Sequence, residues 1–172
     1  NKGKGIENYR NSNGYYNVDF TKATKAKNIS NLSTYEGGCP TTGNVNVLVI
    51  PVEFSDKVHT SKQSLSSLDL ALNGGEREES LKFGMSVSKY YNLSSNGKLN
   101  LNFEIMGGGT KWYKPSKSST YYINQDKNNS SSNADIAIIN SILKANSSNI
   151  DFSHFDSDNN GMLDAVVIVP TI

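Results

Sequence analysis

The chain has 172 residues and a nearly balanced charge, with 17 basic and 16 acidic residues and a formal net charge of +1. This length suffices for one domain with a hydrophobic core, and the balanced charge argues against nucleic acids and anionic membranes as partners. The single cysteine excludes an internal disulfide framework, and the sequence lacks the run of about eighteen apolar residues that a membrane span requires.

Residues 1–38 are polar, rich in glycine, asparagine and lysine, and show no sustained hydrophobic period. We interpret them as a leader or linker segment and residues 39–172 as the folded part of the chain. The first residue is Asn1, and no basic stretch followed by an apolar one is present, so we expect a processed product or an excised piece. The abundance of asparagine, serine, glycine and tyrosine suits an exported protein.

Cys39 lies between Gly38 and Pro40 and allows two interpretations. A thiolate in a leader could occupy the open position of a catalytic zinc and hold a protease latent. The interpretation that we favour is a small buried apolar residue or an unpaired thiol.

The strongest strand pattern is Val45 to Phe54, a nearly continuous apolar and β-branched run that is typical of a strand covered on both faces. Pro51 has no N–H to donate, so it should mark an edge, a bulge or the end of this strand. The next segment, Thr60 to Asn73, predicts a helix that begins at a Thr60-x-x-Gln63 capping box and ends before a glycine pair.

A second helix is predicted from Glu76 to Leu93. Its apolar stripe at helical spacing should pack into the core, and consists of Phe83, Val87, Tyr90 and Tyr91. The dipeptide Asn96-Gly97 then predicts a tight turn. From Lys98 to Ile105 apolar and polar residues alternate, which indicates a half-exposed strand near a sheet edge.

Gly107-Gly108-Gly109 ends that strand and lacks the spacing of a phosphate-binding loop. The segment from Asn124 to Ser132 is polar, and we expect a mobile loop there. Ala134 to Ala145 predicts a third helix, with Ile136, Ile139 and Leu143 facing inward. A buried strand should follow over Ala165 to Val169.

Strands and helices thus alternate along the chain, and this alternation predicts the fold class. We expect an α/β fold, with α+β as the alternative, in which a mixed sheet packs against about three helices.

A candidate calcium site lies in the loop D-S-D-N-N-G-M-L-D, which spans residues 156–164. Calcium prefers six to eight oxygen ligands in a flexible cage. The loop supplies four side-chain ligands and one backbone carbonyl, from Asp156, Asp158, Asn160, Asp164 and Met162. Gly161 falls where the chain must turn sharply. The spacing favours a structural calcium ion over the alternative, a polar turn between two elements.

The loop differs from an EF-hand at its twelfth position, where Val167 replaces the bidentate glutamate. A strand rather than a second helix should therefore follow it. The sequence holds no complete catalytic constellation: it lacks G-x-S-x-G and H-E-x-x-H, and His59 and His154 are far apart along the chain. We therefore assign no catalytic residue to this chain.

Three stretches resemble the immune inhibitor A family of secreted bacterial zinc metallopeptidases. They are V-L-V-I-P-V-E-F-S-D from Val47 to Asp56, S-V-S-K-Y-Y-N-L-S-S-N-G-K-L-N-L from Ser86 to Leu101, and D-F-S-H-F-D-S-D-N-N-G-M-L-D-A-V-V-I-V from Asp151 to Val169. They occur in the order of the family and extend from about Val45 to the end of the chain.

The resemblance implies a zincin-like N-terminal subdomain, so that residues 39–172 would be the N-terminal part of a metallopeptidase-like domain. The zinc ligands and the general base of the family lie in an H-E-x-x-H helix downstream, and no position here matches them. Zinc is therefore expected only in the parent protein, and calcium in this chain. Asn160 stands where the family often has aspartate, which lowers the charge of the calcium site by one.

Two functions remain open from the sequence. The first is the inert N-terminal half of a secreted, calcium-stabilised zinc metallopeptidase. This chain would be a monomeric scaffold, and its parent would bind a protein or peptide substrate. In that case the Lys98 to Ile105 strand is a candidate edge for pairing with substrate. The second is a non-enzymatic extracellular binding or adhesion module, whose aromatic cluster would contact a partner or glycan: Trp112, Tyr113, Tyr121 and Tyr122.

Overall fold

The computed structural model describes residues 39–74, 84–128 and 134–171, and the predicted leader at residues 1–38 lies outside these ranges. The strands are β1 (Gly43–Val52), β2 (Leu99–Ile105) and β3 (Val166–Pro170). The α-helices are α1 (Leu65–Asn73), α2 (Val87–Ser94), α3 (Ser119–Asn128) and α4 (Ala134–Asn146). Short 3-10 turns occur at η4 (Met106–Gly109), η5 (Ser147–Asn149) and η6 (Phe152–Phe155). No helix in the described ranges is long and apolar enough to cross a membrane.

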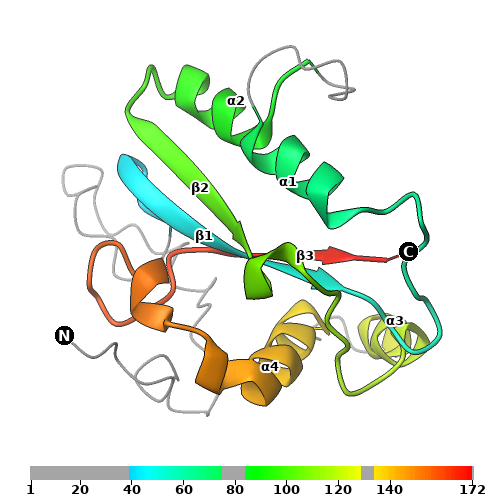
Figure 1. Cartoon of the computed structure of the whole chain (residues 1–172). Coiled ribbons are helices and arrows are strands. Elements are labelled where there is room, and N and C mark those ends of the chain that lie inside the picture. Colours follow the sequence, from blue (N-terminus) through cyan, green and yellow to red (C-terminus); the bar gives the residue numbers. More distant parts are fainter. Residues whose placement is uncertain (1–38, 75–83, 129–133, 172) are drawn as a thin grey trace.

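The three strands form one sheet in the order β2-β1-β3, with α1 and α2 on one face and α3 and α4 on the other (Figure 1). This arrangement confirms the predicted α/β class. The expectation of mixed strand direction is wrong for the described strands, because β1 pairs in parallel with both β2 and β3. Each connection between strands contains helices, and such crossovers join parallel strands. The predicted tight turn at Asn96-Gly97 is present and links α2 to β2.

The central strand β1 separates two apolar clusters, one on each face of the sheet. Leu48, Ile50 and Val52 face α4 and η6 in the first cluster. Val45, Val47 and Val49 face α1 and the apolar side of β2 in the second. Burial on both faces explains why this strand has the continuous apolar pattern seen in the sequence.

Pro51 lies within β1, and the direction of its backbone explains why the strand tolerates it. Gly43 donates its N–H to the carbonyl of Lys98, just before β2, whereas Leu48 donates to the carbonyl of Ala165, just before β3. The backbone N–H and C=O groups of odd-numbered β1 residues therefore point towards β2. The pairing with β2 ends at Val49. The backbone nitrogen of Pro51 therefore points to the side of β2 but lies beyond the end of that strand, so no ladder hydrogen bond is lost. Its carbonyl accepts the N–H of Tyr113 at 2.8 Å.

Polar side chains cover the outer edge of β2. The amide of Asn73 accepts the N–H of Phe103 at 3.0 Å and donates to the Phe103 carbonyl at 2.7 Å, as a neighbouring strand would. Ser88 of α2 donates to the carbonyl of Leu101, and Ser95 accepts the N–H of Leu99. The strand is an edge strand as predicted, but these side chains occupy the groups with which another strand would pair.

The same contacts explain why the predicted stripe of the second helix is wrong. The helix begins at Val87 with Ser86 as its N-cap and turns a polar face towards β2. The side chains of Val87, Tyr90 and Tyr91 are exposed, and that of Tyr90 is 58% accessible. Phe83, the first residue of the predicted stripe, lies outside the described residues.

Replacement of Asn73 by alanine should open the edge of β2. It would leave the partly buried N–H and carbonyl of Phe103 without their partner, which should cost about 1–3 kcal/mol of unfolding free energy. Hydrogen exchange at the Phe103 amide should become faster. The control is N124A, which removes an exposed asparagine from α3. Unchanged exchange at Phe103 would contradict the assigned role of Asn73.

The boundaries of two helices differ from those predicted. Only half of the expected capping box forms: the side chain of Gln63 accepts the N–H of Thr60, but the N–H of Gln63 donates to the backbone carbonyl of Thr60. Helix α1 begins after Ser64, whose hydroxyl accepts the N–H of Ser67. Helix α3 occupies much of the segment that we expected to be a mobile loop. Its N-terminus is held by Asp56, a residue distant in sequence.

Candidate metal centre

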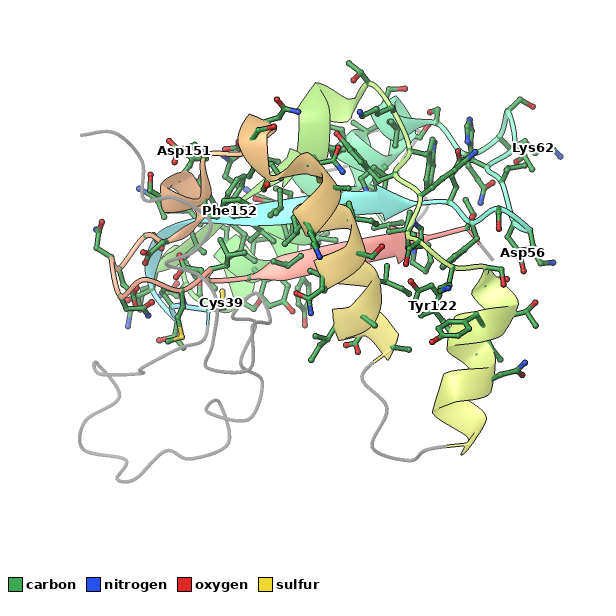
Figure 2. The ribbon with its side chains drawn as sticks, turned by 90° about the horizontal axis from the view of Figure 1, so that it is seen from below. Cys39, Asp56, Lys62, Tyr122, Asp151 and Phe152 are labelled. Atoms are coloured by element: carbon green, nitrogen blue, oxygen red, sulfur yellow. The ribbon has the colours of Figure 1, made fainter. Side chains whose placement is uncertain are left out.

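The predicted calcium loop connects η6 to β3 and lies near the end of the sheet at which β1 begins (Figure 1). Phe152 and Phe155 of η6 are buried in the cluster that α4 covers, and this burial anchors the chain just before the loop. In Figure 2, Asp151 and Phe152 mark this anchor. The backbone N–H of Asp164 donates to the carbonyl of Phe155 at 2.8 Å, which closes the loop on itself. A strand follows, as predicted.

Three predicted ligands come together in this loop. One carboxylate oxygen from each of Asp156, Asp158 and Asp164 lies within 4.8 Å of the others. The loop backbone turns around Asp156, whose two oxygens accept the N–H groups of Asn160 and Gly161 at 2.9 and 3.0 Å. Positive φ angles at Asn159 and Gly161, 56° and 87°, allow this tight path.

Asp164 gives the strongest indication of a cation-binding site. Asp164 is only 5% exposed, and its Oδ1 atom is buried without a hydrogen-bond partner. Its Oδ2 accepts the N–H and the hydroxyl of Ser157. Burial, with the charges of Asp158 and Asp156, raises the pKa of the Asp164 carboxyl above its ordinary value despite the bonds from Ser157. A bound cation would satisfy the buried oxygen and favour the ionised form.

The other two predicted ligands are placed differently. Asn160 directs its Oδ1 to the N–H of Met162 at 2.8 Å and its amide group to Asp158. The side chain of Met162 is buried, and its carbonyl remains a predicted ligand. Both residues belong to the same short loop as the three carboxylates. The side-chain oxygen of Asn160 and the backbone carbonyl of Met162 can therefore add to a set of metal ligands that consists mainly of carboxylates. An all-oxygen set of this kind fits calcium better than metals that prefer nitrogen or sulfur.

Cys39 lies near this loop. Partial burial, together with the negative charge of Asp164, raises the pKa of its thiol, and its sulfur donates to the carbonyl of Pro40. The side chain is an exposed free thiol. These observations agree with the unpaired thiol that we favoured, and the thiolate interpretation stays a prediction.

Neither histidine contributes to a metal-binding group in the described residues. Nδ1 of His59 lies 2.6 Å from buried Glu53, next to the end of β1, and its ring stacks on Trp112. Burial alone would raise the pKa of Glu53, but hydrogen bonds from His59 and the ion pair with Lys114 lower it overall. His154 pairs instead with Glu104 of β2.

The aromatic residues of the binding-module hypothesis do not form one exposed cluster. Tyr113 and Tyr122 are buried core residues. Trp112 is partly buried against His59, and Tyr121 is exposed. The aromatic surface that this hypothesis requires is therefore divided between core and solvent.

A polar contact that the sequence did not predict lies at the opposite end of the sheet. Asp56 accepts hydrogen bonds from the backbone N–H groups and the hydroxyls of Ser119 and Thr120, at the first turn of α3 (Figure 2). These bonds, led by the Ser119 N–H, lower the pKa of Asp56 far below its ordinary range. No local pattern indicates this contact, because its partners are separated by more than sixty residues in the sequence.

No family model matches the chain, and a search of curated proteins finds no match.

Proposed function

We propose that this chain is the calcium-stabilised N-terminal part of the catalytic domain of a secreted bacterial zinc metallopeptidase. Hydrolysis of peptide bonds would belong to the parent protein, because this chain contains no H-E-x-x-H. The observation that carries the proposal is the grouping of three carboxylates around the buried, unpartnered oxygen of Asp164. A calcium ion there would join η6 to β3 and fix the end of the sheet.

The arrangement of the resembling segments supports the peptidase part of the proposal. The segment from Val47 to Asp56 contains most of β1, that from Ser86 to Leu101 contains α2 and the start of β2, and that from Asp151 to Val169 contains η6, the loop and most of β3. All three meet in one sheet in which β1 is central. Segments distant in sequence therefore contribute to a single scaffold, as parts of one domain would.

The scaffold would support a cleft for a protein or peptide substrate in the parent, with the chain itself monomeric. We do not propose that a substrate strand pairs with the middle of β2, the edge that the sequence suggested for this role. Asn73 already occupies the N–H and the carbonyl of Phe103, the groups that an added strand would use.

The test begins with the parent gene. Translation beyond Ile172 should give an H-E-x-x-H on a helical pattern, and the parent should hydrolyse a protein substrate in a manner that a zinc chelator abolishes. The present chain, with zinc and calcium added, should hydrolyse none. Hydrolysis by this chain alone, or a parent without the zinc motif, would overturn the proposal and favour a non-enzymatic binding module.

A further inference from the structure

An open pocket of about 800 Å³ lies beyond the carboxyl end of β2, between α1 and the η5–η6 segment. Its apolar lining comes from several elements and includes Leu48, Leu65, Phe103, Ile105, Met106 and Phe155. The volume is within the range of pockets that bind small ligands. The pocket is separate from the calcium loop, although Phe155 immediately precedes that loop.

The charged groups around the pocket have one predominant sign. Asp69, Glu104 and Asp151 contribute carboxylates, and His154 contributes an imidazole. Neither lysine nor arginine is among the described residues that line it. The pocket therefore combines an apolar floor with a negative rim, and this combination suits a cation on an apolar stem.

Each of the three carboxylates keeps one oxygen available. The hydrogen bonds described for Asp69 and Asp151 use only Oδ1, with Asn73 and with Ser153. Those described for Glu104 use only Oε1, with His154 and Asn102. The remaining oxygens belong to α1, to β2 and to Asp151, the N-cap of η6. Acceptors on three separate segments suit a ligand whose donors are spread over a plane better than one with a single compact donor group.

The glycine turn beside β2 leaves one wall of the pocket without side chains. Gly107, Gly108 and Gly109 have φ angles of 67°, 66° and 67°, which favour glycine. A Cβ at Gly107 would lie 2.3 Å from the Tyr113 hydroxyl, whereas one at Gly108 would meet no atom within 4 Å. The backbone at Gly108 therefore borders open space.

We propose that this pocket binds an arginine side chain of a partner polypeptide. The aliphatic stem would pack on the apolar floor, and the guanidinium would donate to the free oxygens of Asp69, Glu104 and Asp151. Arginine fits better than a compact ammonium because its five donors are spread over a rigid plane. The inference goes beyond the proposed function and does not depend on it.

The test uses the full chain, labelled with nitrogen-15 and saturated with calcium, and follows its amide resonances by NMR. The probe is N-acetyl-arginine methylamide, and the neutral citrulline analogue of the same shape is its control. The arginine probe should shift the amides of Ile105 and residues 107–109 and bind at least about tenfold more tightly than the citrulline analogue. Equal binding of the two compounds, or no shift at these amides, would overturn the proposal.

Two variants test the contribution of charge. E104Q removes one acceptor charge, and S66K places a cation at the rim from an exposed position while keeping all three carboxylates. Each should weaken binding of the arginine probe by about tenfold, with a dispersed amide spectrum showing that the fold is retained. D135N, on α4 and outside the pocket lining, is the matched control and should bind as the unmodified chain does. Unchanged binding by both folded test variants would overturn the proposal.

Discussion

Calcium should raise the melting temperature of this chain, and a chelator should reverse the effect. An ion that binds only the folded state adds about 2.7 kcal/mol to the unfolding free energy at a hundredfold excess over its dissociation constant. For a chain of this size the corresponding increase in melting temperature is about 5–11 °C. The physical reason is the relief of repulsion among Asp156, Asp158 and Asp164, together with a partner for the buried Asp164 oxygen.

D156A should remove most of this calcium effect. The substitution also removes the acceptor for the N–H groups of Asn160 and Gly161, so it should destabilise the calcium-free chain as well. The relevant quantity is therefore the difference in melting temperature between calcium and chelator, measured by calorimetry for each protein. D135N should retain the full difference, because Asp135 lies on α4 outside the carboxylate group. If calcium and chelator give the same melting temperature for the unmodified chain, the loop is only a turn.

The calcium effect should decrease as the pH falls. Its ligands bind calcium in their deprotonated forms, so protons compete with the ion. Because the pKa of Asp164 is raised in the folded state, this competition should begin at a higher pH than for an ordinary aspartate. In the calcium-free chain the raised pKa has the opposite effect on the pH dependence of stability. Protonation of Asp164 favours folding there, so its stabilising contribution is present in acid and disappears as the pH rises through the folded-state pKa. The melting temperatures with and without calcium should therefore converge in acid.

L143A should destabilise the fold by about 2–5 kcal/mol of unfolding free energy. Leu143 lies on α4 and is 0% exposed in the cluster that joins this helix to β1. Truncation would remove its apolar contacts and leave a cavity that a close-packed core fills only in part. Urea unfolding, monitored by circular dichroism in the presence of calcium, measures the change.

The matched control for this truncation is L93A. Leu93 is also in a helix but is 50% exposed on α2, so the same change should cost less than about 1 kcal/mol. Both replacements put alanine in a helix, and the intrinsic helix propensity therefore changes equally in the two proteins. Equal losses would contradict the assignment of α4 to the core, because only burial distinguishes the two positions.

The candidate site could be predicted from the sequence because it is local. Asp156, Asp158, Asn160, Met162 and Asp164 lie within nine consecutive positions, so their spacing alone brings the oxygens into one loop. The structure groups three of the carboxylates and shows the buried oxygen that spacing cannot reveal. The arginine pocket is different in kind, since its carboxylates come from segments around residues 69, 104 and 151.

The sequence by itself determined the central strand, the alternating edge strand, the last strand and α4. Hydrophobic periodicity records which faces are buried, and these segments are long enough for the pattern to be clear. Only the tertiary structure decided that the described strands are all parallel and that α2 turns its polar face to the sheet. Ser88 and Ser95 bond the backbone of β2 there, and a polar contact of this kind leaves no apolar pattern in the sequence. The start of α3 likewise depends on Asp56, whose capping bonds become possible only when the fold brings distant segments together.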